Sequence, residues 1–382
     1  MDATLRAAKR TTGVEPVAVL RPLLPSIDAV LPFLRRIDDT RIYSNYGPLW
    51  REFCDGFAAW LGARAGVPDA VDGAVRVVPT SSGTTAIEIA LRARALPDRR
   101  LCIMPSFTFI ASAHAVCNAG LEPFLVDVEE SSFVLTPAIA IAALRHMPTP
   151  PAAVLVISAF GAPPDVRAWE DFEAEHGIPV VFDAAAAATS LRTIGHQPLC
   201  VSLHATKVFG IGEGGAVITT DAALADRLVA MTGFGFAGVE RVSSLRGGNY
   251  RISEYTAAVG LAVLAGIDAK EARLLALGAR YAEALRNSPC RLQPGAGTDW
   301  ATMTLNVVVP QDRLAATLAR LDADGVQWRR WWGLGTHHHP TFAGLPRTGL
   351  DVTEALAPRV IGVPFHDGLS EADLARVVEA LR

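Results

Sequence analysis

Apolar residues recur along the chain at two different spacings. Residues 27–37 and 49–61 carry apolar side chains every three or four positions, which predicts helices. From residue 75 onward, short runs rich in Val, Ile and Leu recur, each closed by turn-forming residues, which is typical of buried strands. Residues 1–25 are mixed in character and hold several prolines, so we expect an N-terminal arm there.

The strand runs alternate with helical segments through the first part of the chain. Strands are predicted at residues 75–80, 101–104, 121–128, 153–157, 179–182, 201–203 and 216–220. Helices are predicted at residues 86–95, 105–118, 165–175 and 221–232. Repeated units of this kind form a mostly parallel sheet with helices on both faces, and binding sites gather at the carboxyl ends of its strands.

The pattern changes near residue 253. One continuous helix is predicted over residues 253–286, linking a large domain to a smaller one. The smaller domain has a predicted strand at residues 302–309 and predicted helices at residues 311–323 and 370–382. The expected division is an arm (1–25), a large domain (26–255), and a linking helix with a small C-terminal domain (256–382).

The composition narrows the class of protein. A net charge of −4 over 382 residues argues against a nucleic-acid surface, which needs a clustered basic excess. The five cysteines are scattered without a C-x-x-C pair, as in a reduced protein without a thiolate metal site. The N-terminal residues lack an apolar signal segment, and the longest apolar run, residues 178–191, is too short to span a membrane. We therefore expect a cytoplasmic protein with no membrane partner.

One lysine is isolated in an apolar, glycine-rich stretch. The 35 Lys and Arg residues include three lysines, and Lys207 has no basic neighbour between Arg192 and Arg227. A surface lysine at a strand end is the ordinary interpretation. However, a lysine in an apolar site can lose its proton and form a Schiff base, whereas arginine stays protonated. The isolation of Lys207 favours that chemistry.

The same stretch contains a formal dinucleotide-binding motif. Gly210, Gly212 and Gly215 spell G-x-G-x-x-G, but that motif requires a helix after it. The residues that follow, 216–220, are β-branched and predict a strand. We therefore do not interpret the motif as a nucleotide site.

Asp183 is the second candidate for chemistry. It ends an apolar strand run and precedes five alanines, residues 184–188. Two interpretations stand side by side: a helix N-cap, or a buried carboxylate that requires a cation or a strong donor. Together with Lys207 it suggests a third, in which the carboxylate holds a pyridinium nitrogen of pyridoxal phosphate (PLP) protonated while the lysine holds its aldehyde.

Small residues at 81–85 lie between a predicted strand and a predicted helix. Such a junction leaves backbone N–H groups free to bind a phosphate, although an ordinary serine N-cap gives the same pattern. Gly83, Ser106, Asp183 and Lys207 each follow a predicted strand. We therefore expect them at one edge of the sheet, in a single site.

Residues 328–340 contain three Trp, two Arg and three His. A metal site at His337–His339 is disfavoured, because adjacent histidines do not share one face of a regular element. The loop either stacks a base or sugar and pairs a phosphate, or packs at an interface; the sequence leaves both open.

Several stretches together resemble one family. They are SSGTTAIEIAL (81–91), PSFTFIASAHAVCNAGLEPFLVDV (105–128), SAFGAPPDVRAWEDFEAEHGIPVVFDAAA (158–186), SLHATKVFGIGEGGAVITTD (202–221) and GGNYRISEYTAAVGL (247–261). In order and spacing the chain resembles the DegT/DnrJ/EryC1/StrS family of PLP-dependent nucleotide-sugar aminotransferases, of fold type I. The resemblance implies a mixed, mostly parallel seven-stranded sheet between helices and a smaller α/β domain.

The resemblance also implies roles for particular residues. Lys207 would hold the cofactor and move protons, Asp183 would pair with the pyridine nitrogen, and Phe109 would stack on the ring. Asn249 would reach the phosphate of a neighbouring subunit, which implies a homodimer with shared active sites. The phosphate would be bound by Gly83, Thr84, Thr85 and Ser202.

One position departs from the family pattern. Where the family usually has a glutamine that touches the phenolic oxygen of the cofactor, this chain has Ala186. The stretches 44–49, 182–187 and 329–333 look similar to the subgroup that acts at C4 of dTDP-4-keto-6-deoxyhexoses. Candidate substrate contacts are Tyr46, Arg251, Arg329, Arg330, Trp331 and His337.

The expected function is transfer of an amino group from L-glutamate to the C4 keto group of a nucleotide-linked deoxysugar. One alternative is a PLP-dependent sugar dehydratase, although related dehydratases carry His where this chain has Lys207. The other is a silent regulatory or scaffold protein with the same fold, which Ala186 favours.

Overall fold

The computed structural model describes residues 15–67, 74–237 and 241–382. Residues 1–14 of the expected N-terminal arm therefore lie outside the described part. Within the described part, Val17 forms a parallel bridge with Val326, and Phe365 donates its backbone N–H to the Val19 carbonyl at 3.2 Å. The beginning of the described chain thus lies against the C-terminal part of the molecule.

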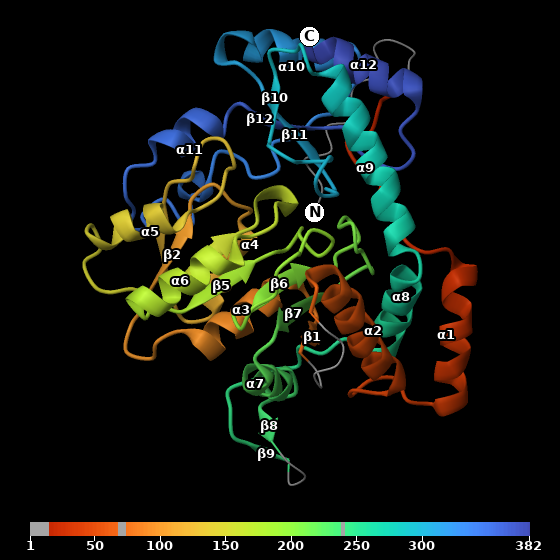
Figure 1. The fold of residues 1–382 in the computed structure, drawn as a ribbon, viewed down its shortest axis with the longest axis vertical. Coiled ribbons are helices and arrows are strands. Elements are labelled where there is room, and N and C mark those ends of the chain that lie inside the picture. Colours follow the sequence, from red (N-terminus) through yellow and green to blue (C-terminus); the bar gives the residue numbers. More distant parts are fainter. Residues whose placement is uncertain (1–14, 68–73, 238–240) are drawn as a thin grey trace.

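A seven-stranded sheet forms the centre of the large domain, in the order β1-β7-β6-β5-β4-β2-β3 (Figure 1). Strand β7 runs opposite to the other six strands, which are parallel to one another. The mixed, mostly parallel sheet is therefore confirmed. The strands are β1 (Arg76–Thr80), β2 (Leu101–Pro105), β3 (Glu122–Val126), β4 (Ala153–Ile157), β5 (Val180–Asp183), β6 (Leu199–Ser202) and β7 (Gly215–Thr219).

Helices cover both faces of this sheet because alternate strand residues point to opposite sides. On one face Val78, Met104 and Val181 belong to a buried cluster with α3, α4 and α7. On the other face Val77, Ile103 and Val180 belong to the larger core with α2, α5, α6 and α8. The helices are α2 (Pro48–Ala65), α3 (Gly83–Arg94), α4 (Ala111–Asn118), α5 (Pro137–Leu144), α6 (Val166–His176), α7 (Ala222–Thr232) and α8 (Glu254–Leu264).

The expected continuous helix over residues 253–286 is wrong. The chain forms two helices, α8 and α9 (Ile267–Ala284), separated at Gly266, whose φ of −121° and ψ of 4° are not helical. Glycine is a weak helix former, so a break there costs little. Helix α9 then extends along the C-terminal part, as Figure 1 shows.

The C-terminal part is built on a three-stranded antiparallel sheet, in the order β10-β11-β12. Helices α10 (Leu314–Ala323) and α12 (Glu371–Leu381) pack against each other. The division into domains made from the sequence stays a prediction. The remaining elements here are β10 (Arg291–Leu292), β11 (Leu305–Val308), α11 (Asp351–Leu356) and β12 (Val360–Val363), and α1 (Ile27–Thr40) lies near the beginning of the chain.

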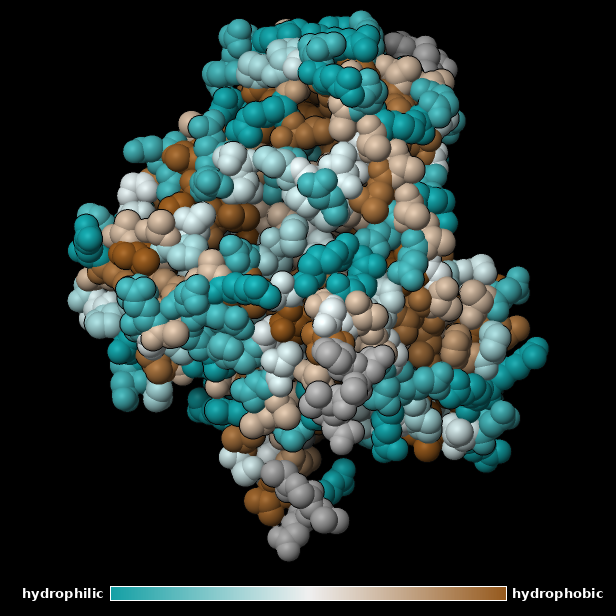
Figure 2. All heavy atoms as spheres, in the orientation of Figure 1, coloured by the Kyte–Doolittle hydropathy of each residue, from teal (hydrophilic) through white to brown (hydrophobic). Residues whose placement is uncertain are grey.

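Hydrophilic and apolar residues are intermixed on the face shown in Figure 2. Within the described ranges, no helix combines the length and the apolar character needed to cross a bilayer. A two-stranded hairpin, β8 (Phe236–Ala237) with β9 (Val242–Ser243), projects from the end of the large domain (Figure 1).

Candidate active site

A cavity of about 490 Å³ opens at the carboxyl ends of the sheet strands, and both Lys207 and Asp183 line it. Its wall includes residues that follow β1, β2, β4, β5 and β6. Ser106, which also follows a strand, does not line it. Three of the four residues expected in one site thus do line the same cavity: Gly83, Asp183 and Lys207.

Asp183 is the last residue of β5 and is 5% exposed. Its carboxylate accepts hydrogen bonds from the Ser112 hydroxyl at 2.6 Å and from the Ala185 backbone N–H at 3.1 Å. Burial raises the pKa of Asp183, while these two donors and the charge of Lys207 lower it. The helix N-cap interpretation is wrong, because the alanine run forms turns rather than a helix.

Lys207 lies in the tight connection between β6 and β7. Burial lowers its pKa, and the nearby charge of Asp183 acts in the opposite direction. At neutral pH, Lys207 is therefore in its neutral amine form for a larger fraction of the time than an exposed lysine is. Burial disfavours the charged form of both groups, whereas the opposite charge of each group favours the charged form of the other.

Glycines in this connection permit close backbone approach. A Cβ at Gly215 would lie 2.4 Å from the Ser82 carbonyl carbon, and one at Gly210 would lie 2.7 Å from the Ala205 carbonyl oxygen. Gly215 begins β7, so the G-x-G-x-x-G match is followed by a strand, as predicted. Gly215 thus lets β7 lie against the beginning of α3, and Gly210 lets the loop that carries Lys207 fold back on itself.

The N-terminus of α3 faces the same cavity. Ser82 is its N-cap and accepts the Thr85 backbone N–H at 3.1 Å, while Gly83 and Thr84 line the cavity. Ser202, at the end of β6, lines it next to Gly83. A Cβ at Gly83 would lie 2.7 Å from the Ser202 Cβ, so no larger residue fits there. Thr85 does not line the cavity; its side chain bonds to Ser82.

Phe109 and Ala186 also line the cavity. The Phe109 ring is 54% exposed, which leaves an apolar surface for a planar ligand. Thr108, beside it, pairs with Ser112 at 3.0 Å, so the loop after β2 is connected to the residue that holds Asp183.

The C-terminal part supplies an aromatic and cationic wall. Arg329, Trp331 and Trp332 line the cavity. Trp332 stacks on Phe160 with ring centroids 3.9 Å apart, and the Arg329 guanidinium lies 4.9 Å from the centre of the Trp331 ring. Arg330 does not line the cavity; it donates to the Pro358 carbonyl instead.

Three other expected contacts lie outside the cavity. Tyr46 pairs with the Thr232 hydroxyl at 3.1 Å, and the Arg251 guanidinium lies 5.8 Å from the centre of the Tyr46 ring. Asn249 is exposed and forms a backbone bridge with Gly233. The structure therefore groups these three residues near one another, and none of them lines the cavity that contains Lys207 in the same chain.

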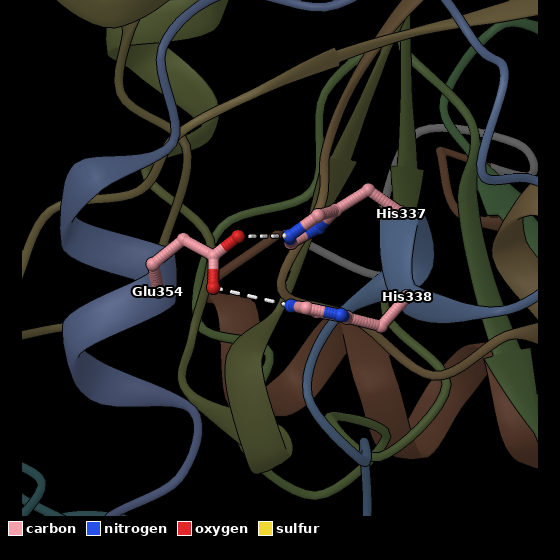
Figure 3. A group of neighbouring side chains, drawn as sticks. All are labelled: His337, His338 and Glu354. Carbon is pink, nitrogen blue, oxygen red and sulfur yellow. Dashed lines mark hydrogen bonds and ion pairs between the residues drawn. The ribbon is translucent and has the colours of Figure 1, made fainter.

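His337 is buried and lies outside the cavity, in a chain of side-chain contacts (Figure 3). Its Nδ1 pairs with the Ser106 hydroxyl at 2.7 Å, and its Nε2 pairs with Glu354 at 2.8 Å. His338 contacts the other oxygen of Glu354 at 3.1 Å. Hydrogen bonds from His337 and then His338 lower the pKa of Glu354.

The expectation that adjacent histidines cannot share one face is wrong for His337 and His338. The short 3₁₀ turn Thr336–His338 brings both rings to the same side, where they face Glu354 (Figure 3). Their nitrogen atoms and the carboxylate lie within 4.8 Å of one another. The polar atoms that face each other are already paired, so the cluster is satisfied without an ion.

Sequence reasoning missed Ser112, Ser158, His204 and Trp332 as lining residues. Ser112 lies inside a predicted helix and Trp332 lies next to another tryptophan. In both cases the sequence does not show where the side chain points. Ser158 and His204 do follow predicted strands, so the rule that sites gather at strand ends was the available signal.

The fold and this cavity define the class of protein. A mostly parallel seven-stranded sheet, with a lysine and a buried aspartate meeting at its carboxyl edge, is the arrangement of the fold type I PLP enzymes. The profile of the DegT/DnrJ/EryC1/StrS aminotransferase family matches residues 29–382. The chain therefore belongs to this family of PLP-dependent sugar aminotransferases, which confirms the predicted family, fold class and enzyme class.

Individual relatives agree with this assignment. Protein Rv3402c of Mycobacterium tuberculosis is 28% identical over 379 residues, covering 96% of this chain and 89% of that protein. A dTDP-3-amino-3,4,6-trideoxy-alpha-D-glucose transaminase of Streptomyces venezuelae is 31% identical, covering 80% and 82%. The crystal structure of DesI in the presence of its TDP-sugar product matches with a TM-score of 0.81 and 29% identity, covering 96% and 92%.

The contacts of His337 generate a prediction about stability. Ser106→Ala removes the hydroxyl that pairs with buried His337, and we expect a loss of about 1–3 kcal/mol in the free energy of unfolding. His338→Ala, which removes an exposed contact to the same Glu354, is expected to cost only about 0–1 kcal/mol. Urea denaturation of the two variants measures the difference. Equal losses would contradict the assigned roles.

Proposed function

We propose that this protein is an aminotransferase that uses PLP to move an amino group from L-glutamate to the C4 keto group of a nucleotide-linked sugar, a dTDP-4-keto-6-deoxyhexose. The observation that carries the proposal is the meeting of Lys207 and Asp183 in one cavity. Overall, the donor becomes a 2-oxo acid as the keto sugar becomes an amino sugar. The transfer balances without an added oxidant or reductant.

The cavity fits PLP at both ends of the molecule. The first-turn N–H groups of Gly83 and Thr84 have no intrahelical acceptor, and with the Ser202 hydroxyl they suit a phosphate at the positive end of α3. In this proposal Thr85 supports that turn through Ser82 rather than by lining the cavity. Phe109 offers its exposed ring to the face of the pyridine.

When bound, PLP supplies an electron sink that eases proton loss from the carbon carrying the amino group. Asp183 supports that role by accepting a hydrogen bond from a protonated ring nitrogen. Ser112 and the Ala185 N–H hold its carboxylate in place and favour its charged form. Lys207 holds the cofactor covalently and, when its amine is free, takes and returns a proton.

The wall contributed by the C-terminal part fits a sugar nucleotide. Arg329 supplies a cation for a phosphate, and Trp331 and Trp332 supply apolar faces for a sugar ring or a base. Arg330 and His337, which do not line the cavity, would then act by positioning this wall rather than by touching the substrate. Arg330 does so through Pro358, and His337 through Ser106 and Glu354.

Tyr46, Asn249 and Arg251 are proposed to complete the site of a second copy of the chain in a homodimer. The support is that none of the three lines the cavity of its own chain, together with the exposed apolar side chains in the same region. Tyr43, Phe234 and Tyr255 are 49%, 45% and 47% exposed. Exposed apolar residues that cluster in this way mark surfaces that partners cover.

The role of Lys207 can be tested by covalent labelling. After incubation with PLP and reduction with borohydride, mass spectrometry is expected to find the cofactor on Lys207. Lys207→Ala should lose the label and reduce turnover at least about a hundredfold, because the proton-transfer group is removed. Lys270→Ala is the matched control and should keep both. Labelled and active Lys207→Ala protein would overturn the assignment.

The substrate can be tested with a panel of keto-sugar nucleotides and L-glutamate. We expect the 4-keto-6-deoxy sugar to gain nitrogen at C4, which mass spectrometry detects and NMR locates. Amination at C3 alone would contradict the C4 assignment and favour a 3-amino product, like the one in the name of the Streptomyces venezuelae transaminase. Loss of a hydroxyl without gain of nitrogen would indicate a dehydratase. No product in spite of bound PLP would indicate a silent scaffold.

Shared active sites can be tested by mixing two inactive variants. Lys207→Ala and Asn249→Ala are each expected to be impaired as homodimers. Co-expressed, they form heterodimers in which one site has both native residues, so about a quarter of native activity should return. Absence of any recovery, with heterodimers present, would show that Asn249 does not act across subunits.

A further inference from the structure

The cavity contains a polar group that the residues described so far do not use. Of the lining residues in the described ranges, Ser158 and Trp331 alone have a buried side-chain polar atom without a hydrogen-bond partner. A Cβ at Gly362 would lie 2.0 Å from Trp331 Nε1, so that nitrogen lies against the backbone of β12. Ser158 is therefore the group left for a ligand.

The position of Ser158 is fixed by its backbone. It follows β4, donates its N–H to the Asp183 carbonyl at 2.9 Å, and accepts the Gly161 N–H at 3.2 Å. Its neighbour Ile157 lies opposite Asp183 in the parallel register of β4 and β5. Ser158 is 4% exposed and its hydroxyl oxygen has almost no accessible surface, so the side chain must turn about its Cα–Cβ bond to present the hydroxyl to a ligand in the cavity. Such a group costs free energy until a ligand pairs with it.

The side chains that follow Asp183 in the chain cannot provide this contact, and the Ser112 hydroxyl already donates to Asp183. Ala185 and Ala186 line the same part of the wall and have no polar side-chain atoms. A Cβ at Gly161 would lie 2.8 Å from the Ala186 carbonyl oxygen, which shows that the segments after β4 and β5 are in contact. A pyridine ring anchored at Asp183 would therefore meet one free hydroxyl on this side.

We propose that Ser158 donates a hydrogen bond to the 3-hydroxyl oxygen of PLP, the ring oxygen that has no partner from Ala186. This assignment rests on the proposed function. An ionised phenolic oxygen is a strong acceptor, and a buried hydroxyl without competing partners is a good donor to it. Ala186 is then compatible with a working enzyme, because Ser158 supplies the donor from the neighbouring strand end.

The test compares PLP with an analogue that lacks the 3-hydroxyl group, by titration of the cofactor-free protein. The native protein is expected to bind PLP about ten- to a hundredfold more tightly than the analogue. Ser158→Ala should remove that preference while binding the analogue as the native protein does, which also shows that the variant is folded. Adding Ala186→Gln to Ser158→Ala should restore part of the preference, because the amide reaches the cavity from the adjacent segment.

The possible failures are distinct. If the native protein binds neither ligand, the proposed function fails and the assignment of Ser158 falls with it. If it binds PLP and Ser158→Ala keeps the full preference over the analogue, only the assignment of Ser158 is overturned. The assignment is also overturned if the variant keeps native PLP binding and instead raises the KM for the keto sugar, since the hydroxyl would then serve the substrate.

Discussion

The site depends on keeping an amine and a carboxylate together in a mostly apolar cavity. Removing either charge from water is costly, so each group needs a partner or must become neutral. The structure supplies both solutions: Asp183 receives two hydrogen bonds, and Lys207 can release its proton. Lysine suits this position because its pKa responds to burial, whereas an arginine there would remain a charged, non-nucleophilic cation.

The scaffold that holds these groups is rigid because it is made of strand ends. Asp183 ends β5, Ser202 ends β6, and Ser158 directly follows β4. Glycines allow the beginning of α3 to approach the end of β6 and the start of β7 within distances that a Cβ would prevent. Because backbone hydrogen bonds fix these strands, the polar groups at their ends need little reorganisation on binding.

The remaining wall comes from segments distant in the sequence. Asp127, after β3, accepts the backbone N–H groups of Val352 and Thr353, each at 2.8 Å, and so ties the first turn of α11 to the large sheet. The Ser106 carbonyl accepts the Thr336 N–H at 2.7 Å, next to the contact with His337. Both connections begin just after strands of the seven-stranded sheet, β3 and β2. They connect the C-terminal part, which supplies Arg329 and Trp331, to the sheet that supplies most of the other lining residues.

The sequence by itself determined the strand-helix alternation and indicated Lys207 and Asp183 as candidates for chemistry, because apolar periodicity and an isolated lysine are local properties. It could not show that residues 137–144 form a helix, since an almost wholly apolar segment has no polar face to reveal the period. Only the tertiary structure decided which polar side chains reach the cavity. The direction of Ser112 or Ser158, and the pairing of His337 with Ser106, depend on packing between segments far apart in the chain, which no local pattern records.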